Sequence, residues 1–248
     1  MPRFFLSSAS AAAAGDRLSL TGEDARHIAL SLRARQGEEI WICDGAGLDC
    51  RCTLEQISPE EVVARVEQVQ PSAAEPPIAV TLYQCLPKGE KAEWIIQKAT
   101  ELGVSRVVFL LSERCVSRPD EKSFAKKCSR FQRIAEEAAK QSGRGIIPQV
   151  TGLVSFREAL AEASAADAPL FCYEGGGTPA GSCIRPETKT VSLLIGPEGG
   201  FSDEEAALAV AGGMVQVSLG RRILRTETAP LCALSILVGR AEEWANSL

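Results

Sequence analysis

The stretch IGPEGGFS at residues 195–202 marks a point where a buried strand meets a turn and then a helix. The run TVSLLI at 190–195 is β-branched and apolar, which is typical of a strand buried on both faces, and it stops where the Gly-Pro pair begins. Ser202 followed by Glu205 has capping-box spacing, and the glycine pair at 212–213 supplies a stop. The sequence therefore predicts a strand, a glycine turn and a helix packed into a short segment.

A second transition of the same kind follows at once. The run MVQVSL at 214–219 predicts another strand, and GRRILRTET at 220–228 leads into a closing helix from about 228 to 244. The first turns of that helix have no polar face, so either the rest of the domain or a second subunit must cover them. A third strand-to-glycine transition lies at 170–177, and all three turns could converge on one ligand.

Standard nucleotide motifs do not account for these loops. Gly-Pro and Gly-Gly pairs punctuate many α/β chains, so the GPEGG run at 196–200 is by itself compatible with an ordinary turn. No Gly-Lys-Ser/Thr follows it, and the G-x-G-x-x-G dinucleotide fingerprint is absent from the chain.

The combination of IGPEGGFSDEE with SLGRRILRTETAPLCAL resembles the C-terminal signature of SPOUT-class RNA methyltransferases. More narrowly, it is similar to the bacterial family that methylates N3 of a uridine in 16S ribosomal RNA. The stretches MPRFF, LPKGEKAEWIIQKATELGV and EEAAKQSGR also match that family, so the resemblance runs nearly end to end. It implies S-adenosyl-L-methionine as cofactor, 16S rRNA or the 30S subunit as partner, a homodimer, and a C-terminal trefoil knot with the cofactor site at about 170–230.

Glycine-rich loops allow the backbone to approach a bound nucleoside closely, and Ile223 and Leu224 could sandwich its base. The candidate cofactor-binding residues are Tyr173, Gly196, Pro197, Glu198, Gly199, Gly200, Leu219, Gly220, Ile223 and Leu224.

Methylation at uridine N3 requires loss of the N3 proton, which leaves negative charge on the ring. The catalytic candidates are therefore Arg225, Glu198 and Glu227, with Arg225 as the electrostatic stabiliser and the glutamates as possible bases. A structural ion pair between Arg225 and a neighbouring glutamate is the open alternative.

Two domains are expected. Short strands at 4–6, 39–43, 49–57 and 61–69 and one helix from 21 to about 37 predict a small β domain over 1–72, and the family has a PUA-like β-barrel for RNA binding there. The proline-rich segment 71–77 is a linker by composition. Strands alternate with long helices over 73–248, which predicts an α/β fold with a parallel sheet, the SPOUT domain of the resemblance.

The net charge of −5 is unevenly distributed. Residues 1–72 and 151–248 carry −4 and −5, whereas 73–150 carry +4, and the segment 106–144 holds 10 basic against 5 acidic groups. Such a concentration suits either a phosphate-contacting surface or a solvated helix face. The candidate RNA contacts are Arg3, Arg33, Arg35, Lys88, Lys91, Arg114, Arg118 and Arg144.

Other compositional features narrow the function. No run approaches the roughly 20 apolar residues of a membrane span, so we expect a cytoplasmic protein. The nine cysteines are scattered and the chain has one histidine, so we expect free thiols and no metal site. Two rival functions remain open: a SPOUT enzyme acting on a ribose 2′-hydroxyl or another base, and a non-catalytic RNA-binding assembly factor.

Overall fold

The computed structural model describes residues 1–247 and divides them into two compact units. The first unit contains residues 1–75 and 139–147, and the second contains residues 76–138 and 148 onward. The division falls inside the predicted linker 71–77. The return of residues 139–147 to the first unit was not expected from the sequence, and it follows from Glu75, which accepts hydrogen bonds from the backbone of Gly145 and Ile146 and pairs with Arg144.

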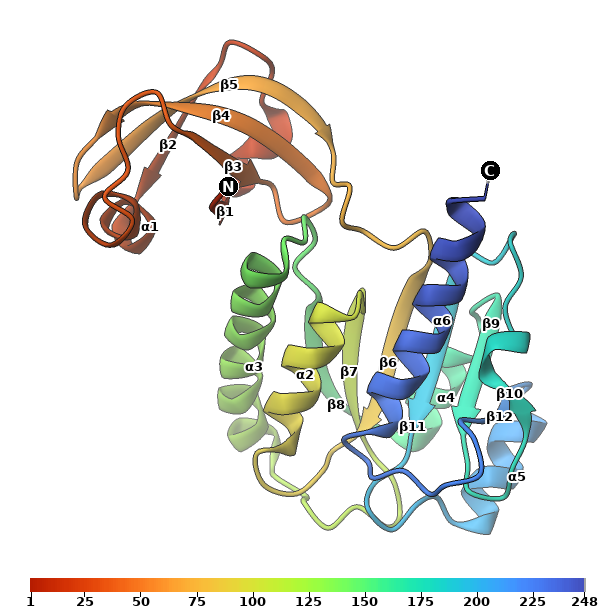
Figure 1. The fold of residues 1–248 in the computed structure, drawn as a ribbon. Helices are drawn as coiled ribbons and strands as arrows, with labels where there is room; N and C mark the ends of the chain where they lie inside the picture. The colour runs from red at the N-terminus through yellow and green to blue at the C-terminus, as the bar shows by residue number, and fades with distance from the viewer. Residues whose placement is uncertain (248) are drawn as a thin grey trace. The chain divides into compact units, whose positions relative to one another are not determined.

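The first unit is a five-stranded curled sheet with strand order β1-β3-β4-β5-β2 (Figure 1). Its strands are β1 (Arg3–Phe5), β2 (Arg17–Thr21), β3 (Glu39–Cys43), β4 (Leu48–Ile57) and β5 (Glu61–Pro71). Only the β1–β3 pair is parallel. Alternate residues of β4 and β5 point inward, so Leu54, Ala64 and Val66 are fully buried in one apolar cluster.

The predicted helix from 21 to about 37 is shorter than expected. The structure has α1 (Gly22–Arg26), followed by a π-helical turn η2 (His27–Ser31), and Arg33 has a φ of 51°, which ends helical geometry. Ile28 is buried but Leu32 is exposed, so the packing supports fewer turns than the apolar spacing indicated. Strand β2 and the 3₁₀ turn η1 (Ser7–Ala11) were not predicted.

The second unit is a seven-stranded parallel sheet with strand order β10-β12-β9-β11-β6-β7-β8. Its strands are β6 (Ala79–Cys85), β7 (Arg106–Leu111), β8 (Gln149–Ser155), β9 (Ala168–Cys172), β10 (Thr178–Pro179), β11 (Thr190–Ile195) and β12 (Val215–Ser218). The segment 190–195 is a strand with the predicted bounds. Strands β8 and β10 were missed, since β8 contains Gly152 and β10 has two residues.

Helices cover both faces of this sheet (Figure 1). The helices are α2 (Lys91–Glu101), α3 (Glu121–Ser142), α4 (Phe156–Ala163), α5 (Asp203–Ala211) and α6 (Ala229–Ala245), with a 3₁₀ turn η3 (Ala180–Ser182). Side chains of α2, α3 and α6 pack in one apolar cluster with Leu82 and Leu193, while α4 and α5 pack in another with Tyr83 and Leu194. Neighbouring residues on β6 and β11 thus pack on opposite faces of the sheet, which explains why these strands are mostly apolar.

The closing helix α6 is largely covered by its own chain. Leu234, Leu237 and Val238 are buried in the main cluster, whereas Ile236 is 36% exposed. Among the described residues, no helix is both long and apolar enough to cross a membrane, and no group of three or more potential ligands could hold a metal ion. All nine cysteines are free thiols.

Candidate functional site

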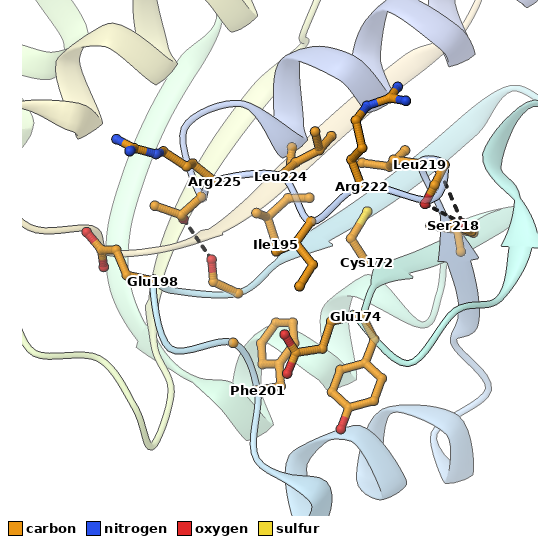
Figure 2. Close-up of a pocket in the computed structure, with 18 of the residues that line it drawn as sticks. Cys172, Glu174, Ile195, Glu198, Phe201, Ser218, Leu219, Arg222, Leu224 and Arg225 are labelled. Carbon is orange, nitrogen blue, oxygen red and sulfur yellow. Dashed lines mark hydrogen bonds between the residues drawn. The ribbon is translucent and has the colours of Figure 1, made fainter.

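A cavity of about 440 Å³ lies at the carboxyl ends of β9, β11 and β12 (Figure 2). Because β9 pairs with both β11 and β12, the loops that follow these strands meet at one edge of the sheet. The lining comes from the ends of the three strands, from the loops that follow them at 173–176, 196–201 and 219–226, and from the first residues of α2 and α6, Lys91 and Ala229. The expected convergence of three strand-to-glycine transitions is therefore present.

The loop after β11 is a tight turn. The Gly200 amide donates a 3.0 Å hydrogen bond to the Pro197 carbonyl, and Gly200 has a φ of +68°, which favours glycine. The capping box predicted at Ser202 and Glu205 is present, and it starts α5 immediately after the turn. Gly199 turns away from the cavity and packs against Arg114.

A buried hydrogen-bond chain ties the 219–226 loop to its neighbours. The Thr226 hydroxyl donates to the Gly196 carbonyl at 2.8 Å and accepts from Gln84 Nε2 at 3.1 Å. Gln84 and Thr226 are both buried. Neither residue was predicted from the sequence as part of the site, and the one available signal was a glutamine within the mostly apolar run of β6.

A charged cluster forms one end of the cavity. The Lys91 ammonium lies 3.2 Å from Glu198 Oε1 and 3.2 Å from Glu227 Oε2, and the Lys88 amide donates to Glu198 Oε1 at 3.0 Å. Burial opposes ionisation of Glu198, but the Lys88 amide and the Lys91 ammonium outweigh it and lower the pKa of this carboxyl group. Partial burial works against the Lys91 charge, and the two carboxylates overcome it and raise the pKa of the lysine. Glu198 and Lys91 therefore stay ionised.

Arg225 lies beside this cluster and extends away from the centre of the cavity (Figure 2). Its Nη1 atom is 4.0 Å from Glu227 Oε1, and its side chain is 83% exposed. An ion pair at that distance and exposure contributes little to stability. The structural ion pair is thus weak, and the guanidinium is accessible to a second molecule.

The predicted cofactor-binding residues lie close together around the cavity. Apart from Gly199, every candidate lines the cavity. Ile223 is 83% exposed, so the apolar walls are formed by Ile195, Leu219 and Leu224 instead of an Ile223–Leu224 pair. Glu227 does not line the cavity, but it contacts Lys91, which does.

The loop at 112–118, which we call the arginine loop, borders the site. Arg118 donates to the backbone carbonyls of Ser112, Glu113 and Cys115 at 2.6, 2.8 and 3.1 Å, which fixes the loop after β7. Arg114 is exposed and donates to the Gly199 carbonyl at 3.0 Å. This loop therefore places a cation against the outer side of the glycine turn.

The prediction of a phosphate contact at Arg144 is wrong. Arg144 is 2% exposed, and its guanidinium lies 2.6 Å from Glu75 within the first unit. Arg3 is also mostly buried and pairs with Asp49 at 2.6 Å, so it has little surface for RNA. Arg33, Arg35 and Lys88 are exposed, as a phosphate contact requires.

A parallel α/β sheet with a cavity at the carboxyl ends of its strands defines a small-molecule-binding α/β protein. A family model described as an RNA methyltransferase domain matches residues 74–238, and one described as an RNA methyltransferase PUA domain matches residues 20–67. The chain therefore belongs to the RNA methyltransferase family, which confirms the resemblance carried by its glycine-loop motifs.

Individual relatives are similar to this chain over most of their length. Ribosomal RNA small subunit methyltransferase E of Bacillus subtilis (strain 168) is 37% identical over 231 residues, covering 90% of each chain. The protein of the same name from Mycobacterium bovis is 32% identical, covering 91% of this chain and 87% of its own. The crystal structure of the Neisseria gonorrhoeae protein of that name, bound to S-adenosyl methionine, has a TM-score of 0.84 and 33% identity, covering 95% of both chains.

Proposed function

We propose that this protein uses S-adenosylmethionine to methylate N3 of a uridine in 16S ribosomal RNA of the small subunit. The observation that carries the proposal is the cavity enclosed by the 196–201 and 219–226 loops at the carboxyl ends of β9, β11 and β12. Similarity to ribosomal RNA small subunit methyltransferases E, one of them crystallised with S-adenosyl methionine, supports the same function.

The residues present suit this cofactor. A volume of about 440 Å³ lies within the usual range of about 300–1,000 Å³ for small-molecule sites. Ile195, Leu219 and Leu224 offer an apolar surface for the adenine, and the loop backbones offer hydrogen-bonding groups for its edge and the ribose. S-adenosylmethionine would supply an electrophilic methyl group there.

The role that we assign to the protein's side chains is to stabilise the negative charge that develops on the uracil. Loss of the N3 proton spreads negative charge over the uracil carbonyl oxygens, and the exposed Arg225 guanidinium can donate hydrogen bonds to them. Glu198 has a lowered pKa and two donors on one oxygen, so it is a weak base, and we assign it to holding Lys91. A guanidinium that favours the uracil anion allows the N3 proton to leave to solvent.

RNA contacts and assembly belong to the same proposal. Arg114, Arg118 and Lys88 are exposed close to the site, and Arg33 and Arg35 are exposed on the first unit, so we propose these arginines and this lysine as phosphate contacts. We also propose a homodimer, supported by the outward-facing Ile236 on α6. The trefoil knot stays a prediction from the family.

Mass spectrometry of 16S rRNA from a strain that lacks the gene tests the proposal. We expect one uridine to lose a base methyl group and to regain it when the gene is restored. Loss of a ribose methyl group or of a different base modification would contradict the N3 assignment. Unchanged rRNA modification together with defective subunit assembly would favour a non-catalytic role.

A further inference from the structure

The 173–177 loop carries a carboxylate that the proposed reaction does not use. Glu174 lines the cavity, and among residues 1–247 it has no hydrogen-bond or ion-pair partner. An ideal Cβ atom on Gly200 would lie 3.7 Å from its Oε1 atom, so the carboxylate reaches across to the glycine turn. Figure 2 shows it near Phe201, within the cavity and apart from the Glu198 end.

The loop that presents Glu174 is anchored on both sides. The Tyr173 hydroxyl donates a 2.9 Å hydrogen bond to Asp203 at the start of α5. Gln216 on β12 donates to the Gly176 carbonyl at 2.8 Å. A Cβ atom on Gly177 would come within 2.5 Å of the Gln216 carbonyl, so the close approach of this loop to β12 requires glycine. Glu174 is thus held at a defined place in the cavity wall.

The two carboxylates that line the cavity differ in availability. Glu198 is neutralised by Lys91 and by the Lys88 amide. Glu174 keeps both oxygens open to a ligand. A cationic, hydrogen-bond-donating group of a bound molecule would therefore find its acceptor at Glu174, because charge-assisted hydrogen bonds to carboxylates are among the strongest available.

We infer that Glu174 is a cofactor-specificity residue that binds the α-ammonium group of the methionine portion of S-adenosylmethionine. The inference rests on the proposed function for the identity of the cofactor. The ammonium fits better than the sulfonium, since the ammonium has N–H donors and the sulfonium has none.

Calorimetry with three ligands tests the assignment. S-adenosylmethionine has the ammonium and the sulfonium, S-adenosylhomocysteine has the ammonium alone, and 5′-methylthioadenosine has neither. We expect Glu174→Gln to raise the Kd of the first two by about tenfold or more, the usual effect of losing one charged hydrogen bond, and to leave the third within about twofold. Glu174→Asp, which keeps the charge on a shorter side chain, should give an intermediate loss.

Glu187→Gln is the matched control, because Glu187 is an exposed glutamate of the same unit that does not line the cavity. It should change none of the three Kd values. Thermal unfolding of both variants should match the wild type, since both side chains are exposed.

Each other pattern overturns the inference. Weaker binding of S-adenosylmethionine alone would place the sulfonium at Glu174, and equal weakening of all three ligands would place the ribose there or indicate a structural role. Unchanged binding of all three would remove Glu174 from the site. A wild type that binds none of the ligands would instead refute the proposed cofactor, so the two failures are distinguishable.

Discussion

Thr226 and Gly196 stand thirty residues apart in the chain and are joined by a 2.8 Å hydrogen bond from the threonine hydroxyl to the glycine carbonyl. Gln84 on β6 donates to the same hydroxyl, so one buried side chain ties two loops and a central strand together. Gly196 and Thr226 both line the cavity, so this bond joins two parts of its wall. The geometry of the site therefore depends on a residue that takes no part in the chemistry.

Thr226→Val should loosen this connection. The variant keeps the shape of the side chain but leaves the Gln84 amide and the Gly196 carbonyl without their partner, at a cost of about 1–3 kcal/mol in unfolding free energy. We expect a lower Tm in calorimetric scans and a several-fold higher Kd for S-adenosylmethionine. Thr226→Ser retains the hydroxyl and should stay close to the wild type. Equal affinity in the valine and serine variants would show that the tether does not shape the cavity.

Gly200→Val should abolish cofactor binding, because Gly200 has a φ of +68° in the cavity wall, a conformation that a β-branched residue resists. Gly213→Val is the matched control, since Gly213 has a φ of +89° but lies outside the cavity lining. Both variants should lose stability in thermal scans, and only Gly200→Val should lose binding in calorimetry. Retained binding in Gly200→Val would contradict the site.

Arg225→Ala should reduce methyl transfer by a factor on the order of 100 to 1000, the cost typical of losing one oxyanion donor, while cofactor affinity stays within a few-fold. Arg225→Lys should recover part of the rate, since lysine keeps the charge but lacks the planar fork. Single-turnover kinetics with saturating RNA measures both effects. Arg185→Ala removes an exposed arginine of the same unit that does not line the cavity, and it controls for general loss of positive charge. Near-normal turnover in Arg225→Ala would refute the catalytic role of Arg225, and only its weak contact with Glu227 would remain.

Arg114→Glu should weaken RNA binding and flatten its salt dependence, by about one unit of slope if one phosphate contact is lost. Filter-binding titrations at several salt concentrations give the slope. Arg185→Glu reverses an exposed arginine in the turn before β11 and should have a smaller effect. If both reversals change the slope equally, the effect is one of net charge and the arginine loop at 112–118 is not the footprint.

Sedimentation should give about twice the 26.4 kDa chain mass. Ile236→Glu places a charge on the outward side of α6 and should shift the protein toward the monomer, whereas Val210→Glu alters an exposed apolar residue on α5 and should not. A wild-type monomer at micromolar concentration would mean that the chain covers α6 well enough by itself, without a second subunit.

Local patterns in the sequence determined the framework of the site. The apolar run of β11, the capping box at Ser202 and Glu205, and the glycine turn between them all depend on residues a few positions apart, so they can be recognised without the fold. Nine of the ten predicted cofactor residues line the cavity, and eight of these nine lie in the paired glycine-loop motifs. Segments with weak local signals, such as β2 and β8, were missed for the same reason.

Only the tertiary structure decided which charged side chains are free to contact a ligand or RNA and which are paired within the protein. Lys91 meets Glu198 and Glu227 across more than a hundred residues, and Arg144 is buried against Glu75, although both cations looked equally suited to phosphate from their neighbours in sequence. Glu174 showed no motif, yet its loop places it in the cavity wall. The sequence gives the charge of a side chain. Its burial and its ion-pair partner depend on chain segments that come together only when the protein folds.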